Sequence, residues 1–280
     1  MGEAIIKSLL AANTISPDEI TVSEPVPQRC NELRAKYGVR TTSDNAEAVR
    51  AATLVVVAVK PQFAAEAMRP MKSVLSPSAL VISIMAGTTI ASIRGSLHAD
   101  QPVVRVMPNT PAQIGLGMSG WTATDNVSAS QITQTQTILQ AMGEEVQVPN
   151  EHYIDLVTGV SGSGPGYVFL IIEAMIDAAV HLGFMRPVAE KLVLQTLKGS
   201  VEYAIQSKTH PAILRNQVTS AGGTTAAGLA ELERGGIRTM IDEAFVAAYE
   251  RAVALGKSVA CLWLLQSRLT AVNPLPNPPP

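Results

Sequence analysis

The chain has 280 residues, of which 47% are hydrophobic and 16% are charged, and its formal net charge is -2. This length allows two domains, and this composition allows a large buried core. The near-neutral charge provides no basic surface for nucleic acid, so we expect no nucleic-acid partner. The two cysteines, Cys30 and Cys261, lie far apart and outside any Cys/His cluster. Neither a disulfide framework nor a metal site is therefore expected.

The beginning of the chain does not show the charged and apolar pattern of a secretion signal. No apolar run approaches the roughly 20 residues that a membrane-spanning helix needs. Cysteine usage of this kind suits a reducing compartment. The sequence therefore predicts a cytoplasmic protein without a membrane partner.

Short β-branched runs alternate with helical stretches in the first half of the chain. We expect strands at residues 20–23, 54–59, 80–85 and 102–107, and helices at residues 1–10 and 26–37. Strands that alternate with helices indicate a doubly wound parallel sheet of the Rossmann type. The sequence thus predicts an NAD(P)-binding, Rossmann-like domain over residues 1–149.

After residue 149 the strand signal disappears, and long helical patterns cover residues 167–182, 187–206 and 237–257. The first of these is apolar on nearly all faces, which favours burial in a helical oligomer interface. A monomeric helical domain with a large core is the alternative. We expect an all-α dimerisation and substrate domain over residues 150–260. The tail, residues 261–280, is proline-rich and is expected to be disordered toward its end.

Ligands of open α/β sheets bind beyond the carboxyl ends of the strands. We therefore expect a nicotinamide cofactor, NADPH or NADH, at the strand-end loops and at the opening of the first helix. The candidate residues are Gly2, Ser23, Glu24, Asn45, Ala58, Val59, Lys60, Pro61, Ala86, Gly87 and Asn109.

The choice between the two cofactors stays open. The carboxylate of Glu24 suits the ribose hydroxyls of NADH, whereas Ser23 and Arg29 can serve a 2′-phosphate. Glu24 and Lys60 also have a purely structural alternative, in which each is a solvated residue of a turn or loop. For Asn109 that alternative is an Asn-Thr-Pro turn.

A run of small residues, 219–225, leads into a helical pattern at residues 226–232. Backbone amides at such a helix start bind anions, and the glycines allow a close approach. An ordinary N-cap is the alternative. The two pairs Thr219-Ser220 and Thr224-Thr225 supply more capping hydroxyls than one helix needs, which favours a ligand site.

Five segments in order resemble the signature of the pyrroline-5-carboxylate reductase family. They read AVKP at residues 58–61, MPNTP at 107–111, SGSGPGY at 161–167, HP at 210–211 and VTSAGGTT at 218–225. The resemblance extends from residue 1 to about residue 257. Ala221 and Gly166 depart from it, since proline and alanine are more usual there in the family.

The resemblance implies a Rossmann domain and a helical domain that interlocks into a dimer, which often assembles further into a ring. It implies that NADPH or NADH reduces (S)-1-pyrroline-5-carboxylate to L-proline, the last step of proline biosynthesis. It assigns the catalytic role to Thr225, whose hydroxyl faces the imine nitrogen. A neutral hydroxyl is a poor general base and acts by orienting the ring. The substrate-binding residues that it implies are Val218, Thr219, Ser220, Gly222, Gly223 and Thr224.

Members of the family usually begin with a strand and Gly-x-Gly-Asn-Met-Gly, and Met1-Gly2 resembles the end of that motif. We therefore expect the first Rossmann strand to be missing from this sequence, through an internal start assignment or a real truncation. A non-catalytic relative that keeps only the helical assembly surface is one alternative. A related β-hydroxyacid dehydrogenase, with Lys191 or Lys198 as its base, is another. The glycine-threonine loop at residues 222–225 argues against the dehydrogenase.

Overall fold

The computed structural model describes the backbone of residues 1–269 and the side chains up to residue 256. The chain forms two compact units, which are Met1–Ser163 with Ala248–Pro280 (unit 1) and Gly164–Ala247 (unit 2). This division lies later in the chain than the predicted boundary at residue 149. The reason is that the helix α7 (Glu151–Val157) packs on strands of unit 1.

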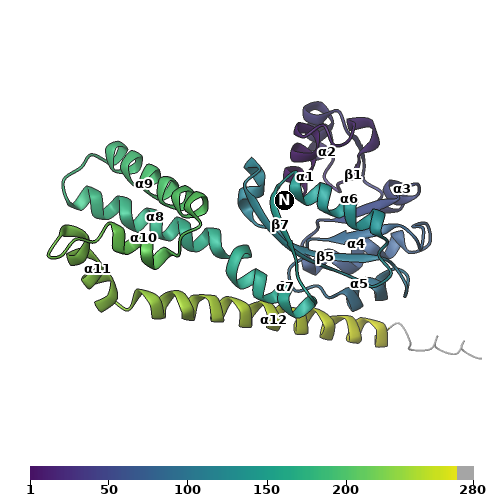
Figure 1. Cartoon of the computed structure of the whole chain (residues 1–280). Coiled ribbons are helices and arrows are strands. Elements are labelled where there is room, and N and C mark those ends of the chain that lie inside the picture. Colours follow the sequence, from purple (N-terminus) through teal and green to yellow (C-terminus); the bar gives the residue numbers. More distant parts are fainter. Residues whose placement is uncertain (270–280) are drawn as a thin grey trace, which may run out of the picture. The chain divides into compact units, whose positions relative to one another are not determined.

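Unit 1 contains a Rossmann-like arrangement of strands in two sheets (Figure 1). One sheet has the order β1-β2 and the other β3-β4-β5-β6-β7, and neighbouring strands are parallel except for the antiparallel pair β5-β6. The predicted Rossmann-type fold is confirmed, although β2, β6 and β7 were not foreseen. The strands are β1 (Thr21–Ser23), β2 (Arg40–Thr42), β3 (Leu54–Val57), β4 (Leu80–Ser83), β5 (Val103–Met107), β6 (Gly117–Ala123) and β7 (Gly143–Gln147).

Helices cover both faces of the larger sheet. Successive side chains of β4 point to opposite faces of the sheet. Leu80 and Ile82 pack with α1 and α6 on one face, whereas Val81 packs with α4 and α5 on the other. All three side chains are fully buried, as expected for a strand covered on both faces. The helices of unit 1 are α1 (Gly2–Ala11), η1 (Pro17–Glu19), α2 (Pro27–Tyr37), α3 (Asn45–Val49), η2 (Pro61–Phe63), α4 (Ala64–Met68), η3 (Arg69–Met71), α5 (Ile90–Ser96), η4 (Thr110–Ile114), α6 (Ala129–Gln140), α7 and the π-helical turn η5 (Thr158–Gly162).

Helix α1 bridges the two sheets. Its residues Ile5 and Leu9 belong to the core of the larger sheet, whereas Ile6 packs with Leu33 and Val39 beside the smaller one. Within the described residues, β1 and β3 do not pair with each other, so the sheet is divided beneath α1.

Unit 2 is entirely helical in residues 164–247, as the sequence predicted. Its own core is small and centres on Ile176, Ala189 and Val193. Large apolar side chains remain exposed instead, including Leu170 at 66% and Leu182 at 80%. Exposed apolar surface of this extent marks an interaction site. The helices are α8 (Gly164–His181), α9 (Arg186–Ser207), α10 (Pro211–Gln217), α11 (Thr224–Arg234) and α12 (Ile237–Leu269), the last of which continues into unit 1.

The structure bears on two further expectations, which concern membrane-spanning length and the C-terminal tail. The helical stretch Glu151–His181 is long and apolar enough to cross a membrane by length and composition alone, so the expectation that no such run exists was wrong. The window that meets this test is not buried within the chain.

The predicted tail begins as a continuation of α12, which ends at Leu269, and residues 270–280 lie outside the described residues.

Candidate active site

The start of α1 lies against the loop that follows β3. A Cβ placed on Gly2 would lie 3.4 Å from the Ala58 Cβ, so the two backbones approach closely. The N-cap residue Met1 provides no side-chain hydrogen bond to the first turn of α1. The amides of that turn are therefore available to an anion, as at the pyrophosphate site of a Rossmann fold. Ala58, Val59 and Lys60 are exposed beside it, and this arrangement fits a dinucleotide.

A cluster around Glu3 ties the same turn to α2. The Glu3 carboxylate accepts hydrogen bonds from Tyr37 at 2.7 Å, from Lys36 at 3.0 Å and from Arg29. The bond from Tyr37, followed by that from Lys36, lowers the pKa of Glu3 to about 2. Arg29 also pairs with Glu32 at 2.8 Å, so its guanidinium is shared by two carboxylates. That sharing weakens the sequence argument for Arg29 as a phosphate ligand.

Glu24 lies directly after β1, where the sequence placed the ribose. Its Oε1 accepts a hydrogen bond from the backbone amide of Val26 at 3.1 Å, and its own amide donates to the Thr42 carbonyl at 3.0 Å. Ser23, at the end of the strand, is half-buried. Glu24 therefore shapes the turn through one carboxylate oxygen, while the other oxygen has no bond among the described residues.

The two candidate asparagines are engaged inside unit 1. Asn45 Nδ2 donates to the Ala67 carbonyl at 3.0 Å. Asn109 Nδ2 donates to the Ser161 carbonyl at 3.1 Å, and its Oδ1 accepts from the Met118 amide at 2.9 Å. Both ends of the Asn109 amide thus organise the loop after β5. Direct binding of the cofactor by these two residues stays a prediction.

The loop after β4 carries Ala86 and Gly87. Gly87 has a φ of 69°, in the left-handed region that favours glycine. A Cβ on Gly87 would lie 3.1 Å from both the Leu255 Cβ and the Gly256 amide nitrogen. This loop is therefore packed against α12, and only glycine fits at its tip.

In unit 2, the loop before α11 exposes the helix start. Gly222 has a φ of 69°, and the Gly223 amide donates to the Ser220 carbonyl at 3.1 Å. Gly223 is the N-cap of α11, and no side chain caps the first turn. The Thr225 hydroxyl, half-buried in that turn, has no hydrogen bond within the described part of the chain. The ordinary N-cap that the sequence left open is therefore absent, and the turn suits an anion.

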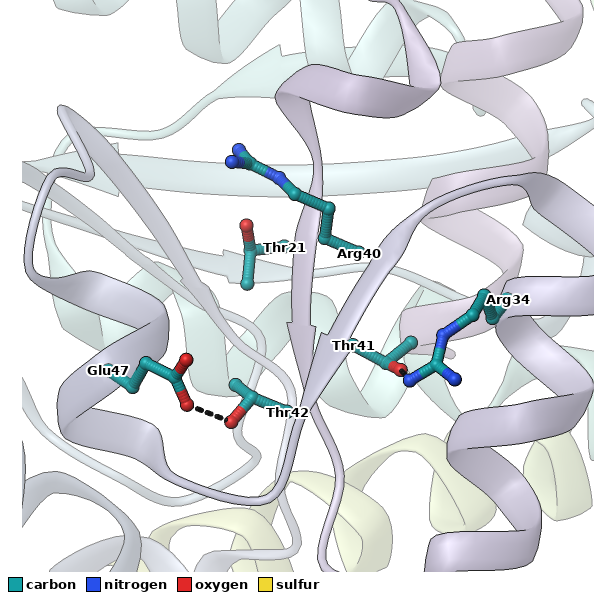
Figure 2. A pocket seen from close by; sticks show the side chains of 6 residues that line it. All are labelled: Thr21, Arg34, Arg40, Thr41, Thr42 and Glu47. Carbon is teal, nitrogen blue, oxygen red and sulfur yellow. Dashed lines mark hydrogen bonds between the residues drawn. The ribbon is translucent and has the colours of Figure 1, made fainter.

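One hollow lies on the surface of unit 1 and another on the surface of unit 2. Figure 2 shows one on the β1-β2 sheet, where Arg34 donates to the Thr41 hydroxyl at 2.7 Å and Thr42 bonds Glu47. None of its lining residues belongs to the predicted site, so it adds nothing to the cofactor assignment. A hollow in unit 2 does contain a predicted residue, and its lining is Arg215, Asn216, Thr219, Ala226, Leu229, Ala230 and Glu233.

Sequence reasoning missed a buried ionic group. Arg105 in β5 is 2% exposed and pairs with Glu151 at 3.1 Å and with Asp155 at 2.8 Å, both on α7. A lone charge within an apolar strand was the available signal, because such a charge needs a partner. His210 caps α10 by accepting a hydrogen bond from the Ala212 amide. The described residues contain no group of three or more side chains suited to a metal.

A Rossmann-like unit with an open first turn in α1, followed by a helical unit, is the architecture of a two-domain dinucleotide-binding protein. Residues 1–87 match the family model described as "NADP oxidoreductase coenzyme F420-dependent", and residues 151–255 match "Pyrroline-5-carboxylate reductase dimerisation". The chain is 43% identical to a pyrroline-5-carboxylate reductase of Synechocystis, over 92% of this chain and 95% of the relative. It is 40% identical to that of Corynebacterium melassecola, over 92% and 96%.

Solved structures agree with these relatives. The pyrroline-5-carboxylate reductase of Coxiella burnetii superposes with a TM-score of 0.85 at 36% identity, covering 91% of this chain and 94% of the other. The Plasmodium falciparum pyrroline carboxylate reductase, solved with NADP bound, gives 0.84 at 33% identity, covering 91% and 94%. The chain belongs to the pyrroline-5-carboxylate reductase family. The resemblance inferred from the five ordered segments is confirmed.

Proposed function

We propose that the chain reduces the C=N bond of (S)-1-pyrroline-5-carboxylate to L-proline with NADPH or NADH, completing proline biosynthesis. The observation that carries this proposal is the start of α11. It combines uncapped amides, the flexible pair Gly222-Gly223 and an unengaged Thr225 hydroxyl. A cyclic imino acid needs one anion site and one hydrogen-bonding group near its nitrogen, and this turn offers both.

The cofactor would be held at the carboxyl ends of the strands in unit 1. The first-turn amides of α1 suit its pyrophosphate, and the residues at the end of β1 suit its ribose. When bound, the cofactor supplies the hydride. The residues assigned to it are Gly2, Ser23, Glu24, Ala58, Val59, Lys60, Pro61, Ala86 and Gly87, with Asn45 and Asn109 ordering the adjoining loops.

The substrate would be held by unit 2. Backbone amides of Thr224 and Thr225 bind the carboxylate, and Val218, Thr219 and Ser220 form the approach to them. The Thr225 hydroxyl donates to or accepts from the ring nitrogen and so fixes the ring. Because a neutral hydroxyl does not titrate near neutral pH, water or the protonated imine supplies the proton.

Thr225→Ala tests this assignment. We expect kcat to fall about 10²-fold, since one positioned hydrogen bond in a transition state contributes about that much. The dissociation constant of NADPH, measured by its fluorescence, should not change. Thr225→Ser retains the hydroxyl and should keep kcat within about threefold of the wild type. Unaltered turnover in Thr225→Ala would exclude the proposed role, and oxidation of β-hydroxyacids in place of imine reduction would favour the dehydrogenase alternative.

We also propose that the exposed apolar side chains of unit 2 form the interface of a homodimer or a larger ring, in the cytoplasm. The match of residues 151–255 to a dimerisation model supports the dimer. Burial of Leu170 and Leu182 in a subunit interface would account for an apolar stretch that is not covered within the chain. Sedimentation velocity of the wild type and of Leu170→Asp measures this, because a charge in the interface should shift the protein toward monomer. Recovery of the wild type in the membrane fraction would contradict the proposal.

A further inference from the structure

Helix α7 holds the loop that follows β4. The amide of Ile90, the first residue of α5, donates a hydrogen bond of 2.8 Å to Glu151 Oε1. Glu151 is the first residue of α7 and follows Ile90 by 61 positions in the chain. The loop with Ala86 and Gly87 is therefore fixed, at its far end, by one carboxylate.

Arg105 fixes that carboxylate in turn. Its Nη1 donates to the same oxygen of Glu151 at 3.1 Å, and its Nη2 donates to Asp155 at 2.8 Å. The Arg105 side chain is 2% exposed, so its guanidinium cannot reorient toward water. A buried, charge-assisted pair of this kind gives Glu151 a single orientation.

The near end of the loop is confined by packing. Gly87 lies against Leu255 and Gly256, and even a Cβ at Gly87 would approach them to 3.1 Å. With its tip confined by α12 and its end bonded to α7, the loop has one position at the carboxyl end of β4. The restraint from α12 is steric contact, and the restraint from Glu151 is a hydrogen bond.

We propose that Glu151 is a positioning residue for the reductase reaction, which presents the Ala86-Gly87 loop to the nicotinamide cofactor. The inference rests on the proposed cofactor site. Glu151 is assigned no contact with cofactor or substrate, and it acts through the Ile90 amide. Asp155 is a suitable control residue, because it also pairs with Arg105 but, among the described residues, has no bond to the loop.

The test compares Glu151→Ala with Asp155→Ala. Each variant removes one partner of Arg105, so both should lower the melting temperature, Glu151→Ala by somewhat more because it also loses the Ile90 bond. Only Glu151→Ala releases Ile90, and we expect its KM for NADPH to rise about tenfold while kcat stays within about twofold. Glu151→Gln keeps an acceptor for the Ile90 amide, so its KM should remain within about threefold of the wild type. This third variant also serves if the alanine variant does not fold, with Glu151→Asp, which is one methylene shorter, expected to raise KM.

Two results would overturn the inference. One is a KM for NADPH that is unchanged in Glu151→Ala, and the other is an equal rise in Asp155→Ala. A wild-type chain without imine reductase activity would contradict the proposed function instead. The dissociation constant of NADPH then carries the test, since release of the loop should weaken NADPH binding by the same factor of about ten.

Discussion

The polar side chains at the candidate sites of unit 1 and unit 2 differ in whether they already form hydrogen bonds within the chain. In unit 1, the side chains of Asn45, Asn109 and Glu24 form hydrogen bonds with backbone groups of the same unit. In unit 2, the first turn of α11 has no side-chain cap, and the Thr225 hydroxyl has no bond among the described residues. The candidate cofactor site of unit 1 therefore presents mainly backbone groups, whereas the candidate substrate site of unit 2 keeps polar groups that have no internal bond among the described residues.

This difference separates the expected effects of substitutions. Changes at the loops of unit 1 should reduce the free energy of unfolding, because they break bonds that already exist. Replacement of the Thr225 side chain at the start of α11 should leave that free energy nearly constant and lower turnover instead. Each of the following measurements, made at one fixed protein concentration because the chain self-associates, tests that separation.

The largest effect on stability is expected at Arg105. Arg105→Ala leaves Glu151 and Asp155 without their partner, and removal of one member of a buried ionic group costs about 3–5 kcal/mol. Since both carboxylates are partly exposed, we expect about 3 kcal/mol in urea unfolding. Arg34→Ala, which loses an exposed bond to Thr41, should change stability by less than about 0.5 kcal/mol. Equal values for the two variants would show that the buried group contributes nothing.

Two glycines with the same φ allow a direct comparison. Gly87 and Gly222 both have a φ of 69°, so alanine at either position should cost about 1–2 kcal/mol of backbone strain. At Gly87 the added Cβ also meets Leu255 and Gly256, which raises the cost to about 3 kcal/mol. At Gly222, none of the described residues lies within 4 Å of the added Cβ. A larger loss of unfolding free energy in Gly222→Ala than in Gly87→Ala would reverse the comparison.

A smaller effect is expected at Asn109. Asn109→Ala removes two hydrogen bonds, and at about 1 kcal/mol each the free energy of unfolding should fall by about 2 kcal/mol. Asn45→Ala removes one bond and should cost about half as much. If Asn109→Ala instead abolished NADPH binding at unchanged stability, its amide would be a cofactor ligand and the contrast between the units would fail.

Strand prediction from the sequence succeeded where β-branched residues run together and failed at β6. That strand contains Gly117 and Gly120, which disfavour a strand by propensity. Both are required by packing, since a Cβ at Gly120 would lie 2.6 Å from a Val157 methyl and one at Gly117 would lie 2.8 Å from the Ala112 Cβ. The contact between Gly120 and Val157 joins segments that lie far apart in the chain, so it leaves no local pattern in the sequence.

The candidate site shows the same limit. Spacing and strand ends correctly predicted Gly2 at a helix start, Gly87 after a strand and residues 219–223 before a helix, because these features depend on local backbone geometry. Their roles in binding stay predictions. The engagement of Asn109 could not be predicted, since its partner Ser161 lies 52 residues away. Glu151 was missed for the same reason, as it acts on Ile90 across a comparable separation.

The smallest expected effect concerns Glu3 and depends on pH. Its pKa is lowered to about 2 from an ordinary value of 4.5, so the folded state holds the ionised carboxylate more strongly than the unfolded state does. The resulting stability is present above pH 4.5 and is lost as the pH falls toward 2. Because the side chain is one-third exposed, screening reduces the gain, and Glu3→Gln should cost about 1 kcal/mol at pH 7.

Urea unfolding of the wild type and of Glu3→Gln at pH 7 and at pH 3 measures this contribution. The difference between the two proteins should shrink at pH 3, where the carboxylate has lost part of its advantage over the amide. Glu32→Gln, whose carboxylate pairs with Arg29 on an exposed surface, should show about 0.3 kcal/mol or less at pH 7. A difference for Glu3→Gln that is the same at both pH values would assign the effect to shape, because the Glu3 carboxyl titrates in the wild type and the glutamine amide of the variant does not. The first turn of α1 would then be held to α2 by neutral hydrogen bonds, chiefly that from Tyr37.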